Sequence, residues 1–309
     1  MLEFGASLSD CLPLLLLPAI ALLLRNALPA WAFMWAMAFA IFFGCKWLTW
    51  LRAHRSGFHL TIARSLGYLF AWPGMDAMAF CATNPGIVPK TLRTLRIGAW
   101  NLKLPWSLKF EVWSFAAAKT IIGAVILWSA ARTSITPLVA GWLALIGLVL
   151  FLHFGLFHLL ALSWKAAGIN AQPIMRAPLL ATSLAQFWGR RWNTAFHTLA
   201  HDFIFRPLAS RWGTTAAGIG VFLISGLVHE SVISLPARGG FGLPTAYFAM
   251  QSLGVLVERS SWGRRFGLGH GFRGWLFVVL CAGAPAFWLF HPIFIRNIIL
   301  PMLHALGAN

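Results

Sequence analysis

Residues 213–235 read GTTAAGIGVFLISGLVHESVISL, and this stretch indicates a helix that crosses a membrane. A crossing helix needs roughly 17 to 25 mostly apolar residues, and the stretch meets that length. It also carries His229, well away from both of its ends. A histidine at membrane depth is costly unless it faces protein or a water-filled cavity. The stretch therefore predicts a membrane helix in which His229 is either a reactive group or a packing residue.

A polar segment precedes this helix. Residues 186–193 read QFWGRRWN, and His197, His201 and Arg206 follow before the apolar run begins. The window 186–230 also holds two of the seven acidic residues of the chain. Ionisable groups that lie within or next to a membrane helix mark a functional site by default. We therefore expect the functional site in this window.

Composition points to an all-α, multi-pass transmembrane protein. Of the 309 residues, 59% are hydrophobic and 10% are charged, which is typical of helical membrane proteins rather than of soluble domains. Long apolar runs exclude a transmembrane β-barrel, whose strands alternate in short segments. The net charge of +17 does not indicate nucleic acid as a partner, because Lys and Arg fall in short loops between apolar runs. These cations are suited to phosphates of an anionic cofactor or of lipid headgroups.

Seven segments are long and apolar enough to be spans. They are 11–28, 31–50, 111–131, 135–160, 213–235, 241–258 and 274–290. The mixed segment 62–82 contains Arg64, Pro73, Gly74 and Asp76, so it either lies at the interface or re-enters the membrane. If it does not span, four of the 24 Lys and Arg (Arg25, Arg132, Arg238 and Arg296) fall on one side, eighteen on the other, and Lys46 and Lys119 inside spans. The positive-inside rule then favours seven spans with the N-terminus and Asn193 at the cytoplasmic face.

The remaining features fit a single integral-membrane domain over 1–309. The first apolar run lacks a basic region and a small-residue cleavage site, so we expect it to be retained as a span. The four isolated cysteines show no spacing typical of disulfides or zinc. Segment 84–110 indicates a basic surface helix or helix pair, either as an anchor or as a rim for an anionic substrate. The loops and the absence of a retention signal favour a bacterial inner membrane over the endoplasmic reticulum.

A single buried histidine has a well-defined chemistry. A neutral imidazole accepts the proton of a hydroxyl as that hydroxyl attacks a thioester carbonyl, and later returns it to the leaving group. Ser225 and Gly226 share a helical face with His229 and offer a hydroxyl and a gap beside the ring. Glu230 is adjacent in sequence and so points elsewhere. Because no Gly-x-Ser-x-Gly elbow is present, direct transfer between two bound substrates is favoured over an acyl-serine.

Three other polar features have two interpretations each. Asn193 is either a helix N-cap or a donor to a substrate carbonyl or oxyanion. Arg190 and Arg191 either pair with phosphates or set the topology. His197 and His201 have the i, i+4 spacing of metal ligands, but the larger histidine clusters of membrane di-iron oxygenases are absent, so no metal is expected.

A structural role is the first expectation for two further features, the pair His153 and His158 and the acid Asp76. His153 and His158 are five apart and do not share an α-helical face well, so packing or cavity lining is expected of them. Asp76 is expected to cap the helix that starts there or to be a functional intramembrane acid.

The motifs in this window resemble a known family. Residues 187–193, FWGRRWN, resemble the signature of the wax synthase branch of the membrane-bound O-acyltransferases, and residues 225–230, SGLVHE, resemble its histidine motif, 36 positions after the asparagine. Two further patches are similar, Trp72-Pro73-Gly74-Met75-Asp76-Ala77 and His291-Pro292-Ile293-Phe294 with Asn297. The resemblance covers roughly 70–305.

The resemblance implies transfer of a fatty acyl group from acyl-CoA to a hydroxyl acceptor, most often a long-chain alcohol. His229 would be the catalytic base and Asn193 its partner, with Arg190, Arg191, Trp188, Trp192 and Ser225 as substrate- or CoA-binding residues. Acyl-CoA would be a co-substrate, and no other cofactor is implied. The implied fold has a tunnel across the membrane, which the donor enters from the cytoplasm and the lipid acceptor from the bilayer.

Two alternatives remain at this point. The first is a related acyltransferase, whose acceptor would be diacylglycerol, a sterol or another hydroxylated metabolite. A lipid transporter or lipid-binding protein is the alternative from another class, although no pair of matching halves with interrupted helices is evident in the sequence.

Overall fold

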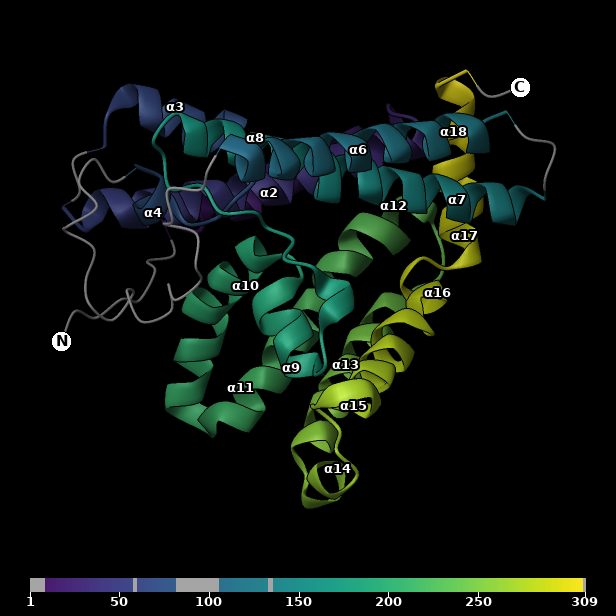
Figure 1. Ribbon diagram of the computed structural model, residues 1–309. Coiled ribbons are helices and arrows are strands. Elements are labelled where there is room, and N and C mark those ends of the chain that lie inside the picture. Colours follow the sequence, from purple (N-terminus) through teal and green to yellow (C-terminus); the bar gives the residue numbers. More distant parts are fainter. Residues whose placement is uncertain (1–8, 58–59, 82–105, 133–135, 308–309) are drawn as a thin grey trace.

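The computed structural model describes residues 9–57, 60–81, 106–132 and 136–307 (Figure 1). Within these ranges every regular element is a helix, as the composition predicts. The longer helices are α1 (Leu12–Leu23), α2 (Ala30–Arg55), α3 (Ile62–Ala71), α6 (Trp106–Ala130), α7 (Pro137–Val149), α8 (Phe157–Ala166), α10 (Thr194–Ala200), α11 (Arg206–His229), α13 (Leu243–Arg259) and α15 (Gly271–Val278). The short helices are α4 (Ala77–Cys81), α9 (Leu184–Gln186), α12 (Leu235–Ala237), α14 (Ser261–Arg265), α16 (Ala286–Leu289), α17 (Pro292–Phe294) and α18 (Leu300–Ala305).

Several helices contain a π-helical segment. These are η3 (Leu150–Leu156), η5 (Phe187–Arg191), η6 (His201–Phe205), η7 (Glu230–Ser234), η8 (Val279–Gly283) and η9 (Ile295–Ile299). Such wide turns are rare and often occur at functional sites, because they change which side chains share a helix face. One of them, η5, lies within the motif 187–193, and another, η7, begins at Glu230, the last residue of the motif 225–230.

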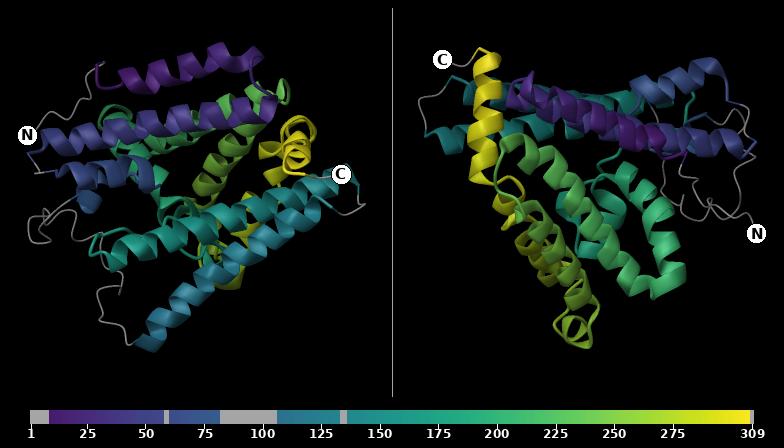
Figure 2. Two further views of the ribbon diagram at one scale, coloured as in Figure 1. Left: turned by 90° about the horizontal axis from the view of Figure 1, so that it is seen from above. Right: turned by 180° about the vertical axis from the view of Figure 1, so that it is seen from behind.

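The helices form two groups (Figures 1 and 2). Helices α2, α6, α7 and α8 lie across the top of Figure 1, with α1 packed beside α2 and α6 packed against α7 and η3. Helices α10 to α16 extend below this layer, and α18 stands at one end of it. The predicted site segment, α9 to α11, therefore lies below the layer of long helices.

The segment 194–237 is a helical hairpin rather than one straight helix. Gly213 interrupts it with φ 82° and ψ 165°, a conformation that glycine adopts without the steric penalty of a Cβ. The chain reverses there, and α11 continues as a second arm that packs against α13 (Figure 1). This arm corresponds to the predicted span 213–235.

All seven predicted spans correspond to helices. Five helical segments, the hairpin among them, are long and apolar enough to cross a membrane: Ala30–Arg55, Glu111–Ala130, Pro137–Ala166, Thr194–Ala237 and Gly271–Leu289. The predicted spans 11–28 and 241–258 form the shorter helices Leu12–Asn26 and α13. The chain is an integral membrane protein, and the total of seven spans stays a prediction.

The mixed segment 62–82 does not form one long helix. Helix α3 has ten residues and rises about 15 Å, half of the hydrocarbon thickness of a bilayer. Residues 72–76 that follow are not helical, and Asp76 caps α4 by accepting a hydrogen bond from the Ala79 amide at 2.8 Å. The capping interpretation of Asp76 is thereby confirmed. The surface helix predicted at 84–110 lies mostly outside the described residues.

Side-chain hydrogen bonds fix the patches at the two ends of the resemblance. Lys46 on α2 donates to the Gly74 carbonyl at 2.7 Å, which holds the turn before α4. His291 accepts from the Phe294 amide at 3.1 Å and lies 3.4 Å from the Ser234 hydroxyl. Asn297 donates to the Ala237 carbonyl at 2.8 Å. The C-terminal patch thus anchors the end of the helix that carries His229.

Candidate active site

A large cavity runs between the two groups of helices. Its volume is about 2620 Å³, and its walls come from α2, η3 and α8, the segment 172–205, the second arm of α11 and α13. Pockets for drug-sized ligands are typically 300 to 1,000 Å³, so this cavity has room for long acyl chains. His229, Asn193, Trp188, Trp192, Arg191 and Ser225 all line it, and Arg190 is exposed outside it.

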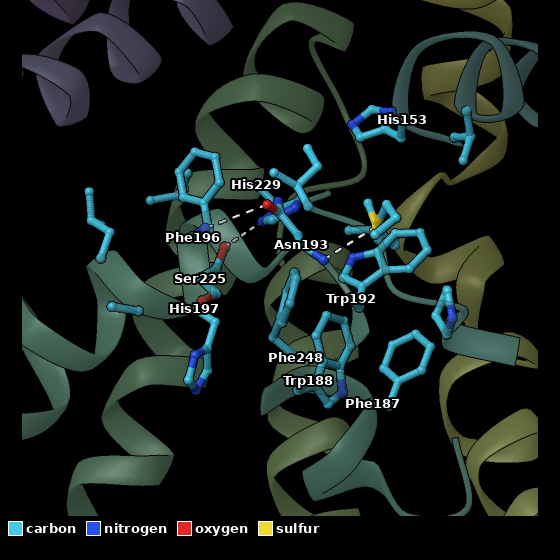
Figure 3. Close-up of a pocket in the computed structure, with 18 of the residues that line it drawn as sticks. His153, Phe187, Trp188, Trp192, Asn193, Phe196, His197, Ser225, His229 and Phe248 are labelled. Carbon is cyan, nitrogen blue, oxygen red and sulfur yellow. Dashed lines mark hydrogen bonds between the residues drawn. The ribbon is translucent and has the colours of Figure 1, made fainter. Parts of the chain in front are cut away.

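His229 is held in one orientation by its own helix. Its Nδ1 lies 2.7 Å from the Ser225 carbonyl oxygen, which only accepts, so Nδ1 carries the proton. The lone pair of a neutral ring is then on Nε2, for which no hydrogen-bond partner is found among the described residues. The ring centroid is 4.5 Å from that of Phe248 on α13. The geometry therefore presents one basic nitrogen in the wall of the cavity (Figure 3).

Asn193 begins α10 in a left-handed backbone conformation with φ 41°, which asparagine tolerates better than most residues. Its Oδ1 accepts from the Phe196 amide at 3.5 Å, so the residue is an N-cap as one interpretation predicts. Its backbone amide donates to the sulfur of Met175 at 3.3 Å. Within the described part of the chain, the Nδ2 donors have no acceptor. Figure 3 draws this side chain and the His229 ring in the same part of the cavity.

The segment between α9 and Asn193 is held by α13, through residues that the sequence did not single out. Glu258 is buried, and its carboxylate accepts from the amides of Leu184 at 2.5 Å and of Ala185 at 3.5 Å, which caps α9. Gln251 is fully buried and accepts from the Trp188 indole at 3.2 Å. A buried acid within an apolar helix was the available signal for Glu258, since such groups need a partner.

Aromatic packing completes this segment. The Trp192 and Phe187 rings stack with centroids 5.5 Å apart and planes 13° apart, and the Trp192 amide donates to the Phe187 carbonyl at 2.8 Å, across η5. Trp188 packs against Phe222 and Phe248. The two tryptophans thus form part of a rigid apolar wall next to Asn193.

The two arginines differ in their surroundings. Arg191 donates from Nη1 to the carbonyls of Ala177 at 3.0 Å and Arg176 at 3.3 Å. Ala177 has φ 46°, a strained value for alanine. Arg191 thus ties the segment 174–177 to the site, and Arg190 is exposed to solvent or headgroups.

Ser225 contributes its backbone more than its side chain. Its hydroxyl donates to the Val221 carbonyl at 2.8 Å, and its carbonyl orients His229. The gap that we expected at Gly226 is filled, because a Cβ there would meet Thr245 on α13 at 2.8 Å. Glu230 turns away from His229, as expected: its Oε1 accepts from the amides of Gly242 at 2.9 Å and Thr245 at 3.1 Å, at the start of α13.

The other four histidines considered in the sequence analysis form two pairs. His197 and His201 stack at 6.2 Å, His201 lies 3.2 Å from Asp202, and among the described residues no group of three potential metal ligands comes together. His153 and His158 both line the cavity. Their spacing of five was expected to separate them on an α-helix, but η3 widens the turn and brings i and i+5 closer to one face.

Comparisons with known proteins match the part of the chain that holds this candidate site. The model of the "Membrane bound O-acyl transferase family" matches residues 171–250, which include Asn193 and His229. "Probable long-chain-alcohol O-fatty-acyltransferase 7" of Arabidopsis thaliana is 29% identical over 146 residues, which are 42% of each chain. "Probable long-chain-alcohol O-fatty-acyltransferase 9" of the same plant is 32% identical over 152 residues, 43% of this chain and 42% of the relative. Its "Acyl-CoA--sterol O-acyltransferase 1" is 30% identical over 98 residues, 28% of each. The matches thus span less than half of the length of these relatives.

Proposed function

Because residues 171–250 match the model of the membrane bound O-acyl transferase family, we propose that the protein transfers a fatty acyl group from acyl-CoA to the hydroxyl of a lipid. The proposal rests on the orientation and tautomer of the His229 ring. Its Nδ1–H is held by the Ser225 carbonyl at 2.7 Å, and its Nε2 is left as the basic nitrogen in the wall of a large apolar cavity.

The reaction follows from that nitrogen. The acceptor hydroxyl attacks the thioester carbonyl carbon while Nε2 takes its proton, so that a C–O bond forms and the C–S bond then breaks. The proton passes from the imidazolium to the departing thiolate of CoA, which restores neutral His229. General bases of this kind contribute about 10²- to 10⁴-fold to the rate.

Asn193 has the second role. Its Oδ1 is engaged by the Phe196 amide, which orients the side-chain amide and leaves Nδ2 as a donor. A donor aimed at a carbonyl oxygen that gains charge stabilises the transition state by roughly 2.7 to 4 kcal/mol. We assign Nδ2 to the thioester oxygen, with the Trp188 and Trp192 wall and the Ser225 side chain facing the acyl chain.

The side chains that line the cavity indicate which acyl donor and which acceptor it suits. The cavity is mostly apolar, which suits an acyl chain and a long-chain alcohol and makes wax ester the first expected product. Arg190 and Arg191 are assigned to the CoA phosphates; Arg190 is the freer of the two, because Arg191 is bonded to backbone carbonyls.

A sterol is the second candidate acceptor. One relative is named as a sterol acyltransferase, and a cavity of about 2620 Å³ has room for a ring system beside the acyl chain. Diacylglycerol is the third acceptor in this class.

The orientation is part of the proposal. Eighteen of the 24 Lys and Arg, Arg190 and Arg191 among them, lie on one side of the predicted spans, which the positive-inside rule assigns to the cytoplasm. Acyl-CoA is water-soluble and would enter there. A bacterial inner membrane, rather than the endoplasmic reticulum, stays a prediction from the sequence.

The deciding measurement is ester formation by membranes that contain the protein. Labelled palmitoyl-CoA is supplied with hexadecanol, a sterol, diacylglycerol or a short alcohol. We expect His229→Ala to lower the rate by roughly a hundredfold or more, because the general base is lost. His197→Ala, which removes another histidine of the cavity wall, is the matched control and should stay active.

Two results would contradict the proposal. One is a folded, membrane-inserted His229→Ala protein with full activity. The other is folded native protein that forms no ester with any acceptor, which would favour the lipid-binding or transport alternative.

A further inference from the structure

Three further polar side chains, which we call the polar cluster, line the same cavity on elements that the proposed reaction does not use; two of them, Lys119 and His158, are in contact. Lys119 on α6, His153 on η3 and His158 on α8 all line the cavity. None of the three belongs to the two motifs or to the segment 171–250. In Figure 3 the His153 ring stands apart from His229 and Asn193, at the upper right of the view.

The cluster offers hydrogen-bond donors. The Lys119 ammonium, which only donates, lies 3.2 Å from Nδ1 of His158. That nitrogen therefore accepts, and the proton of a neutral His158 ring is on Nε2, which becomes a donor. Nδ1 of His153 is buried and has no partner among the described residues. Burying such a group costs free energy unless a ligand or a water molecule forms a hydrogen bond with it.

The positive charge of Lys119 is not balanced within the described chain. The ion pairs found there join Arg52 and His201 to Asp202, and Arg55 to Asp10.

The other described acids are placed elsewhere. Glu230 and Glu258 accept hydrogen bonds from backbone amides, and Asp76 caps α4. Glu111 is exposed on α6, eight residues from Lys119, or about 12 Å along the helix. A cation at this depth normally pairs with an anion, so an anionic ligand would supply what the protein does not.

The positions of the cluster are set by close helix packing. A Cβ on Gly155 would overlap Thr120, and one on Gly123 would overlap the backbone of Phe151, so α6 and η3 are in backbone contact. Small residues permit this approach in membrane helices. The cluster is therefore built by rigid elements rather than by a loop.

The surroundings decide which anion fits. Phe115, whose ring centroid is 4.9 Å from the Lys119 ammonium, Leu152 and Phe157 line the cavity beside the cluster. One ammonium with imidazole donors matches a single negative charge, whereas phosphate sites favour arginine forks or several cations. We propose that Lys119, His153 and His158 form a subsite for the carboxylate of a long-chain amphiphile. That amphiphile is a free fatty acid or the acid end of a hydroxy-acid acceptor.

Binding without turnover tests this subsite apart from catalysis. Radiolabelled palmitate is titrated onto the full chain in nanodiscs of uncharged lipid, with unlabelled hexadecanol as the uncharged competitor of equal length. We expect saturable palmitate binding that Lys119→Met weakens by about tenfold or more, because a desolvated charge pair is lost. Lys119→Arg, which keeps the charge, should retain saturable binding.

Two controls isolate the cause. Lys165→Met removes a cation of α8 that does not line the cavity and should bind palmitate like the native chain. His229→Ala should also bind palmitate normally, whether or not acyl transfer is its function. Thermal unfolding midpoints equal to that of the native chain show that each variant is folded.

The source of the carboxylate is decided by a second arm. We compare the acylation rates of ω-hydroxypalmitate and of hexadecanol in the native chain and in Lys119→Met. If the variant acylates ω-hydroxypalmitate more slowly but hexadecanol at the native rate, the carboxylate belongs to the acceptor. If palmitate binds but the variant shows no such difference between the two acceptors, the carboxylate belongs to a free fatty acid. Equal palmitate affinity in folded Lys119→Met and native protein, or competition by hexadecanol as strong as by palmitate, overturns the subsite.

Discussion

At the scale of single residues, the site depends on how two side chains divide their hydrogen-bonding atoms. His229 uses Nδ1 to hold its orientation, which leaves Nε2 as the nitrogen that we propose as the base. Asn193 uses Oδ1 as a helix cap and keeps Nδ2 as a donor. The two interpretations of Asn193, as a cap and as an oxyanion donor, are therefore compatible, because they use different atoms.

Replacing Asn193 with aspartate separates these two roles. Asn193→Asp keeps an oxygen that caps α10, since aspartate is as good an N-cap as asparagine. It removes the Nδ2 donor, and we expect the rate of ester formation to fall by about 10²- to 10³-fold with little change in the thermal unfolding midpoint.

A neutral control excludes an effect of the added charge. Asn193→Ser also keeps a capping oxygen and should lose activity to a similar extent. Full activity in both folded variants would leave Asn193 with the cap alone.

At the scale of elements, α13 is the support of the site. Thr245 meets Glu230 at its start, Gln251 holds Trp188, and Glu258 caps α9. Gln251 and Glu258 are seven residues apart, two helical turns, so they point to the same side. One helix thus holds both the His229 arm and the segment that ends in Asn193.

Removing the Glu258 carboxylate should loosen that segment. The cap is worth about 0.5–2 kcal/mol, and we expect Glu258→Ala to speed hydrogen exchange of the amides between 184 and 193. Ester formation should fall with it, because Asn193 is less well placed.

Glutamine is the conservative replacement at this position. Glu258→Gln keeps an acceptor oxygen and should show a smaller effect on both exchange and activity. Exchange in Glu258→Ala equal to the native rate would show that α9 does not depend on this carboxylate.

At the scale of the whole molecule, the distribution of basic residues predicts which loops share a face. Ser56 follows α2 and Arg238 follows α12, and both are exposed. The seven-span prediction puts the first in the cytoplasm and the second on the opposite side.

Labelling of single cysteines in intact cells tests this orientation. In a chain without its four native cysteines, an impermeant maleimide should modify Arg238→Cys and leave Ser56→Cys unmodified until the cells are permeabilised. The reverse pattern would show that the topology is the opposite of the one proposed. Labelling of both positions from outside would show that the number of spans between them is even rather than odd.

The class of fold could be predicted from the sequence alone, and so could the residues that we propose for the site. Length and hydropathy predict membrane helices because the bilayer core sets the length that a helix needs. Motif spacing identified His229 and Asn193, 36 positions apart. These features are readable because they depend on local patterns.

The tertiary structure decided how those residues are held. The tautomer of His229 comes from a contact within one helix turn, but Glu258 and Leu184 are 74 positions apart, and Lys119 and His158 are 39 apart. Such pairs are brought together by helix packing, which periodicity does not specify. The π-helical turn η3, which precedes His158, was likewise not predicted, because its residues carry no pattern that separates it from an α-helix.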